Sequence, residues 1–179
     1  MKIALIGRPN VGKSTLFNRL IGQKNAIVGD SPGITRDRKI VSTDFFGIHV
    51  EVIDTPGIDT FSKDELAKSM NQQSFEALKE SDVVFFVIDA IEGITEYDKS
   101  IAIWLRQSFK KCQNRPVIVI KNKSEKFSTQ CNARQLGFGE GIAISAEHSL
   151  GFDEILKTLS GFDSPVEIAI EKEIPLNIA

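Results

Sequence analysis

The most informative segment of this 179-residue chain is Gly7-Arg8-Pro9-Asn10-Val11-Gly12-Lys13-Ser14. It matches the pattern Gly-x4-Gly-Lys-Ser, with an apolar run before it and apolar residues of helical spacing after it. A strand before this pattern and a helix after it are the context that defines a phosphate-binding loop. The alternative, a chance Gly-Lys-Ser in an ordinary loop, leaves both flanking elements unexplained.

The residue types in this loop suit phosphate groups and a divalent cation. Gly7 and Gly12 allow the backbone to curl until its N–H groups point at phosphate oxygens, and the N-terminus of the following helix adds positive potential. We expect Lys13 to reach the β- and γ-phosphates and the Ser14 hydroxyl to bind Mg²⁺. All residues from Gly7 to Thr15 are therefore expected to line a bound nucleotide.

Hydrophobic patterning on either side of the loop predicts an α/β fold. Continuous apolar runs lie at residues 3–6, 83–88, 117–120 and 142–144. Continuous rather than alternating runs are typical of strands buried on both faces of a parallel sheet. Apolar residues with helical spacing lie within residues 16–21, 65–80, 101–109 and 152–159. These segments alternate along the chain, as in a sheet covered by helices.

One stretch breaks the alternation. Residues 39–46 and 48–53 flank Gly47 and predict two strands joined by a tight turn. The expected order is therefore β-α-β-β-α-β-α-β-α-β-α. It describes an α/β P-loop NTPase fold with a six-stranded, mostly parallel sheet, one antiparallel edge strand and helices on both faces.

Composition limits the domain count and the class of partner. The chain has 22 Lys and Arg against 24 Asp and Glu, a net charge of −2, which argues against a dedicated nucleic-acid clamp. Residues 1–161 predict one folded domain, and residues 162–179, with Pro165 and Pro175, predict a linker or tail. Cys112 and Cys131 lack zinc or redox spacing, and no apolar run reaches the ~18 residues of a membrane span. We therefore expect a cytoplasmic protein.

Three more polar segments follow predicted strands. Asp54-Thr55-Pro56-Gly57 offers a carboxylate for Mg²⁺ and a Gly57 N–H for a γ-phosphate, although it is also a common turn sequence. Asn122-Lys123-Ser124-Glu125 offers a carboxylate that can accept two hydrogen bonds from a guanine edge. Ser145-Ala146-Glu147 offers a backbone N–H, that of Ala146, for the guanine O6. The ends of parallel strands meet at one edge of a sheet, so these segments predict one guanine-nucleotide site.

Together these motifs resemble the translation-factor-type GTPases. The stretch Asp30 to Arg38 and the run Ile144 to His148 resemble, within that group, the first GTPase domain of the Der (EngA) family of bacterial tandem GTPases. The resemblance implies GTP and GDP as ligands, hydrolysis of GTP, and Thr35 as a residue that reaches Mg²⁺ and the γ-phosphate. It also implies a second GTPase domain and a KH-like domain in the same protein, and a role in assembling the large ribosomal subunit. Residues 175–179 resemble the opening strand of such a second domain, and an ordinary extended tail is the alternative.

Two positions depart from familiar patterns. Ile58 stands where Ras-like GTPases place a water-orienting glutamine and has no hydrogen-bonding group. The resemblance therefore implies a monovalent cation, K⁺, with Asn10 as a ligand and a catalytic role, although Asn10 could instead only stabilise the loop. Glu125 stands where the family has aspartate, so its carboxylate lies ~1.5 Å further from the backbone. We expect guanine contact to be weaker or rearranged there.

Three functions fit these features to different degrees. The leading hypothesis is a slow, K⁺-stimulated GTPase switch with Lys13, Thr35, Gly57 and Asn10 in catalytic roles. The second is a nucleotide-sensing module with negligible turnover, since Ile58 cannot orient water. The third, a P-loop kinase or ATPase, leaves Asn122 to Glu125 without a role.

Overall fold

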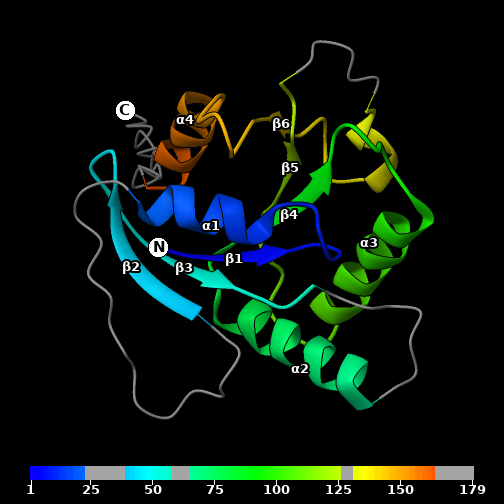
Figure 1. Ribbon diagram of the computed structural model, residues 1–179. Coiled ribbons are helices and arrows are strands. Elements are labelled where there is room, and N and C mark those ends of the chain that lie inside the picture. Colours follow the sequence, from blue (N-terminus) through cyan, green and yellow to red (C-terminus); the bar gives the residue numbers. More distant parts are fainter. Residues whose placement is uncertain (23–38, 58–64, 126–130, 164–179) are drawn as a thin grey trace, which may run out of the picture.

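The computed structural model describes residues 1–22, 39–57, 65–125 and 131–163 (Figure 1). Its strands are β1 Lys2–Ile6, β2 Lys39–Phe45, β3 Ile48–Asp54, β4 Val83–Asp89, β5 Val117–Asn122 and β6 Ile142–Ala143. Its helices are α1 Lys13–Ile21, α2 Glu65–Glu80, α3 Glu96–Phe109, the 3-10 helix η1 Ala133–Leu136 and α4 Phe152–Asp163. Thr35 and Ile58 lie outside the described residues, as do residues 164–179 of the tail expected over residues 162–179. Residues 162 and 163 belong instead to the end of α4.

The six strands form one sheet in the order β2-β3-β1-β4-β5-β6. All neighbouring pairs are parallel except β2 with β3, so the expected architecture with one antiparallel edge strand is confirmed. The hairpin turns at Phe46 and Gly47, whose φ angles are 50° and 89°. The Gly47 N–H donates to Asp44 Oδ1 at 2.6 Å, and this turn pairs Phe45 with Ile48.

Helices cover both faces of the sheet (Figure 1). In β1, Ile3 and Leu5 point into a core shared with α1 and α4, whereas Ala4 and Ile6 point into a core shared with α2 and α3. All seven residues of β4 are buried, which explains why its first six residues, Val83 to Ile88, are apolar. The phosphate-loop strand β1 lies in the middle of the sheet, between β3 and β4.

The interval before β6 differs from expectation. The predicted order includes a helix between the last two strands, whereas residues 131–141 contain only the four-residue η1. Asn132 caps its start and Gly137, with φ of 75°, ends it. Gly139 and Gly141 also have positive φ, so the helix cannot continue toward β6.

The described helices include none that is both long enough and apolar enough to cross a membrane.

Candidate nucleotide-binding site

The loop between β1 and α1 is tightly curled. Gly12 precedes α1 with φ of 93°, and a Cβ atom there would lie 2.2 Å from Asn122 Nδ2. A Cβ atom on Gly7 would lie 2.4 Å from the carbonyl oxygen of Val87. Asn10, at the loop's apex, also has a positive φ of 65°. Both glycines are therefore required by close packing, and Gly12 also by its backbone conformation.

Lys13 lies inside the curl and is only 6% exposed. Its Nζ donates to the carbonyl oxygens of Gly7 at 3.1 Å and Arg8 at 2.8 Å. Burial lowers the pKa of Lys13 to about 8; the nearby Asp54 carboxylate opposes this shift and the Arg8 guanidinium adds to it. An ammonium group has three protons, so this geometry leaves one donor for an anion within the loop.

Two of the three residues expected to bind Mg²⁺, Ser14 and Asp54, are neighbours. Ser14 Oγ donates to Asp54 Oδ2 at 3.2 Å, because the parallel register places Asp54 opposite Leu5 at the end of β1. A hydroxyl and a carboxylate are oxygen ligands of the kind that Mg²⁺ shares with phosphates and water in nucleotide sites. No group of three or more His, Cys, Asp or Glu side chains that could hold a metal ion by itself occurs in the described residues.

The segment after β3 lies against the phosphate loop. Thr55 Oγ1 donates to the Leu5 carbonyl oxygen at 2.6 Å. A Cβ atom on Gly57 would lie 2.6 Å from Pro9 N, so only glycine allows this approach. The Gly57 backbone thus lies beside the phosphate loop.

Asn122 joins three loops from a buried position with 2% exposure. Its Nδ2 donates to the Val11 carbonyl oxygen at 2.9 Å, and its Oδ1 accepts from the Ala146 N–H at 3.0 Å. The Ala146 N–H that we expected to serve a guanine O6 is therefore used within the protein. This amide reaches the base only by sharing or exchanging its bond to Asn122.

Lys123 adds a second connection to the phosphate loop. Its φ is 66°, and its Nζ donates to the Asn10 carbonyl oxygen at 3.0 Å and to Asp89 Oδ2 at 2.6 Å. Burial alone would raise the pKa of Asp89, but hydrogen bonds from Lys123 and from the Glu92 and Ile91 amides lower it. Asp89 was not among the site residues predicted from the sequence, although it is the last residue of a buried strand that ends at the same sheet edge.

Glu125 is turned toward Ser145, whose Oγ donates to Glu125 Oε1. This hydrogen bond lowers the pKa of the Glu125 carboxyl, so the group is a carboxylate at neutral pH. Ser145 Oγ also accepts from the His148 N–H at 3.2 Å. The structure thus brings Glu125 together with the Ser145–Glu147 loop, despite its longer side chain.

The side chains of Arg8 and Arg19 make contacts that the motifs did not predict. Arg8 points away from the loop toward α3, 2.5 Å from Glu92 and 3.5 Å from the fully buried Asp98. Asp98 also completes the capping box of α3 with Thr95. Arg19 donates from Nε to the Ala146 carbonyl at 2.9 Å and from Nη2 to the Glu147 carbonyl at 2.6 Å. In the sequence, Arg19 is one more polar residue on the exposed side of an amphipathic helix.

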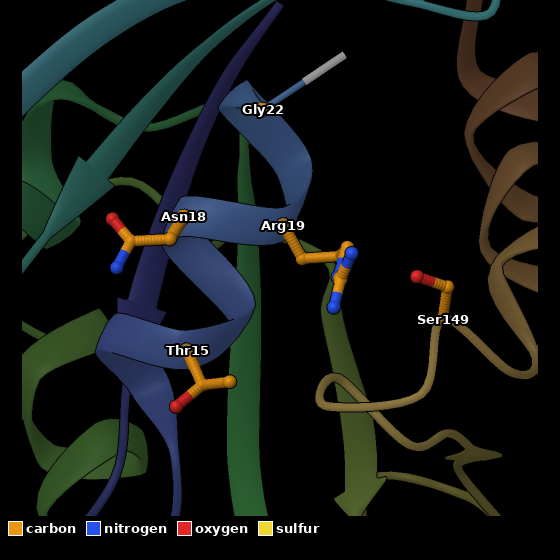
Figure 2. Close-up of a pocket in the computed structure, with 5 residues that line it drawn as sticks. All are labelled: Thr15, Asn18, Arg19, Gly22 and Ser149. Atoms are coloured by element: carbon orange, nitrogen blue, oxygen red, sulfur yellow. The ribbon is translucent and has the colours of Figure 1, made fainter.

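A pocket of about 490 Å³ lies beside these contacts, lined by Thr15, Asn18, Arg19, Gly22 and Ser149. Figure 2 shows the Arg19 side chain extending from α1 toward the loop that carries Ser149. Thr15 therefore has one side on the phosphate loop and another on this pocket.

The fold and the loops gathered at one sheet edge define a P-loop protein of the GTPase class. The chain belongs to the family of 50S ribosome-binding GTPases, which it matches over residues 2–123. It is 41% identical to GTPase Der of Caldicellulosiruptor saccharolyticus over 180 aligned positions, which cover 99% of this chain and 40% of that protein. It is also 41% identical to GTPase Der of Hyphomonas neptunium, covering 98% of this chain and 34% of that one. The chain thus spans two fifths or less of the length of these relatives.

Solved structures agree with this placement. A variant of Aquifex aeolicus Era bound to GDP and AlF4⁻ is 34% identical, with a TM-score of 0.69 over 99% of this chain and 59% of that one. A second structure of Era, with the same identity and TM-score, contains MgGDPNP and a segment of 16S ribosomal RNA.

Proposed function

We propose that this chain is the GTPase domain of a longer protein and that it binds GTP and GDP and hydrolyses GTP to GDP and phosphate. The observation that carries the proposal is Asn122, which ties the phosphate loop at Val11 to the Ser145–Glu147 loop at Ala146. Lys123 contacts the phosphate loop at Asn10, and Glu125 contacts Ser145. A base attached to phosphates bound in the loop could therefore lie beside both side chains. The two Era structures, which hold GDP or GDPNP, support the same ligand class.

Each residue of the proposed site has a separate part in the proposed reaction. Lys13 uses its remaining donor on the β- and γ-phosphates and withdraws charge from the transferring phosphoryl group. Ser14 and Asp54, with Thr35, would hold Mg²⁺, which when bound neutralises phosphate charge. The Gly57 N–H contacts the γ-phosphate and so distinguishes GTP from GDP. Asn122, Lys123 and Glu125 orient the guanine.

We further propose that a monovalent cation, K⁺, assists hydrolysis and that Asn10 is one of its ligands. Asn10 is exposed at the apex of the phosphate loop, and its carbonyl is held by Lys123 at 3.0 Å, so its backbone position is fixed. Ile58 has no donor or acceptor with which to orient water. Phosphate release measured in K⁺ and in Na⁺ at equal ionic strength tests this; faster release in K⁺ is expected, and equal rates contradict it.

Base selectivity tests the main proposal. A fluorescent GDP analogue should be displaced by GTP at a far lower concentration than by ATP. Adenine lacks the pair of N–H donors from which the Glu125 carboxylate would accept hydrogen bonds. Comparable displacement by the two nucleotides would overturn the guanine assignment. The family and relatives carry the name GTPase, which favours turnover over a module that only senses nucleotide.

At the level of the cell, we propose a cytoplasmic role in assembly of the large ribosomal subunit. The family description and the relatives named Der support this role. A second GTPase domain and a KH-like domain, joined through residues 162–179, would account for the greater length of those relatives. The free thiols of Cys112 and Cys131 fit a reducing compartment. Cosedimentation of the full-length protein with 50S particles in the GTP and GDP states tests the ribosomal role.

A further inference from the structure

Arg19 connects the helix that begins at the phosphate loop to the loop expected to read the base. It lies six residues after Lys13 on α1, so about 9 Å of rigid helix separates the two side chains' attachment points. Its guanidinium donates to two consecutive carbonyls, those of Ala146 and Glu147. These contacts span more than 120 residues of sequence and add a second connection, besides Asn122, between the two parts of the site.

The contact closes a ring of interactions. From Val11 the chain passes through the first turns of α1 to Arg19, then across to Ala146. The Ala146 N–H donates to Asn122, whose Nδ2 returns to the Val11 carbonyl oxygen. The residue pair 146–147 is therefore held on one side by Asn122 and on the other by Arg19. Removing either one leaves its backbone position less defined.

The contact between Arg19 and the Ala146 carbonyl also sets the direction of the neighbouring Glu147 N–H. In a planar trans peptide the C=O and the following N–H point in opposite directions. Because Arg19 holds the Ala146 carbonyl toward α1, the Glu147 N–H of the same peptide unit points away from α1. None of the hydrogen bonds among the described residues uses this Glu147 N–H, whereas the Ala146 N–H is bonded to Asn122. Arg19 thus fixes the direction of an amide that is open to a ligand.

We propose that Arg19 is a positioning residue for base recognition, aligning the Glu147 N–H to donate to the guanine O6. Guanine presents an acceptor at O6 and adenine presents an amino donor at the equivalent position, so a fixed N–H favours guanine and repels adenine. The proposal rests on the proposed guanine-nucleotide function. It assigns to Arg19 an effect on selectivity and on nucleotide release, beyond any effect on stability.

Charge distribution agrees with a positioning role. Arg19 is exposed beside the pocket in Figure 2, and the ion pairs found among the described residues do not include it. Its bonds are to backbone carbonyls, which fix geometry without cancelling its charge. Lysine at this position keeps the charge but lacks the planar fork that reaches two carbonyls at once.

The test compares Arg19→Met and Arg19→Lys with the unchanged protein. We expect Arg19→Met to release fluorescent GDP about tenfold faster and to narrow the preference for GDP over ADP by about the same factor, as for loss of charge-assisted hydrogen bonds at an exposed site. Displacement by inorganic tripolyphosphate, which has no base, should change by less than about twofold. Arg19→Lys should recover part of the selectivity.

Arg134→Met is the matched control, since Arg134 is an exposed arginine on η1 that pairs with Glu140. A lowered melting temperature with an unchanged GDP/ADP ratio in both Arg19 variants would overturn the proposal, because it would show a structural contact only. An equal loss of tripolyphosphate binding would do the same. If the unchanged protein itself fails to prefer GDP to ADP, the proposed function fails, which is a separate result.

Discussion

The phosphate side and the base side of the site are built by different means. On the phosphate side, backbone packing sets the shape: Gly7 and Gly12 approach other groups too closely for any side chain, and Lys13 is buried. On the base side, hydrogen bonds from Arg19, Lys123 and Ser145 hold the loops in place. Side-chain bonds can be lengthened or exchanged one at a time, whereas close backbone packing cannot. Glu125 takes part on the base side through such a side-chain bond, which it accepts from Ser145.

The largest effect is expected at the phosphate side, from Gly12→Ala. The new Cβ would meet Asn122 Nδ2 at 2.2 Å, on a residue with φ of 93°. We expect nucleotide binding to fall by more than about 100-fold and stability to fall by about 2–3 kcal/mol, from left-handed strain and displacement of Asn122. Nucleotide titration and thermal unfolding measure both.

Gly47→Ala separates the two causes. Gly47 has a similar φ of 89°, but a Cβ there meets nothing within 4 Å. This control should lose about 1–2 kcal/mol of stability and keep its nucleotide affinity. If both variants bind nucleotide equally well, the close packing at Gly12 does not contribute to nucleotide affinity.

Asn122→Asp is expected to have the next largest effect, because the Asn122 side chain is hydrogen-bonded to both the phosphate side, at Val11, and the base side, at Ala146. The change removes the donor to the Val11 carbonyl and places a negative charge against it in a site that is 2% exposed. We expect a loss of about 3 kcal/mol in unfolding free energy, measured by denaturant titration at pH 7. Asn132→Asp, at the cap of η1, preserves its acceptor to the Arg134 N–H and should change stability by less than about 0.5 kcal/mol. Equal losses in the two variants would contradict the joining role of Asn122.

The lowered pKa of Lys13 predicts that stability and nucleotide binding depend on pH, with an effect of intermediate size. Its pKa of about 8 in the free protein lies below the unfolded value of 10.5, so the folded state binds fewer protons between these values. Stability of the free protein therefore rises as pH increases through this window. A bound phosphate should favour the protonated form of Lys13. Nucleotide binding at pH 9 is therefore expected to take up nearly one proton, and nucleotide affinity is expected to fall as pH rises further.

Calorimetry of GDP binding in two buffers with different ionisation enthalpies measures this proton uptake. The same titration at pH 6.5, where Lys13 is already protonated, supplies the control and should show little uptake from this group. Absence of any difference between pH 6.5 and pH 9 would mean that Lys13 does not contact the phosphates.

The smallest effect is expected on the base side, from Glu125→Asp. The shorter side chain loses reach toward Ser145 but restores the carboxylate distance of the family pattern. We expect GDP affinity to rise by less than about tenfold, since one hydrogen-bond geometry is exchanged for another. Competition against fluorescent GDP measures the change. A large loss of affinity would show that guanine contact depends on the longer glutamate.

The sequence predicted most of the fold because its signals are local. Continuous apolar runs identified β1 and β4, and Gly47 between residues 39–46 and 48–53 identified the hairpin. The helix expected before β6 is replaced by η1, since Gly137, Gly139 and Gly141 all adopt positive φ, which a count of elements does not reveal.

The candidate site was predictable as far as its motifs extend. Asn122 and Ser14 were recognisable by type and spacing, and the structure places them beside Val11 and Asp54. The role of Arg19 was not recognisable, because its two partners are 127 and 128 residues away in the sequence. The use of the Ala146 N–H by Asn122 is likewise a tertiary contact that no local pattern encodes.

The central position of β1 has a consequence for how the chain acquires its ligand during synthesis. The phosphate loop is synthesised early, but the strand before it, β1, pairs with β3 and β4, which are synthesised later. The Val11 carbonyl likewise gains its hydrogen bond only after Asn122 has been synthesised. A nascent chain that has not yet extended past the 145–147 loop therefore lacks the base half. Under the proposed function, the full binding free energy of the nucleotide is therefore available only after both halves of the site have been synthesised.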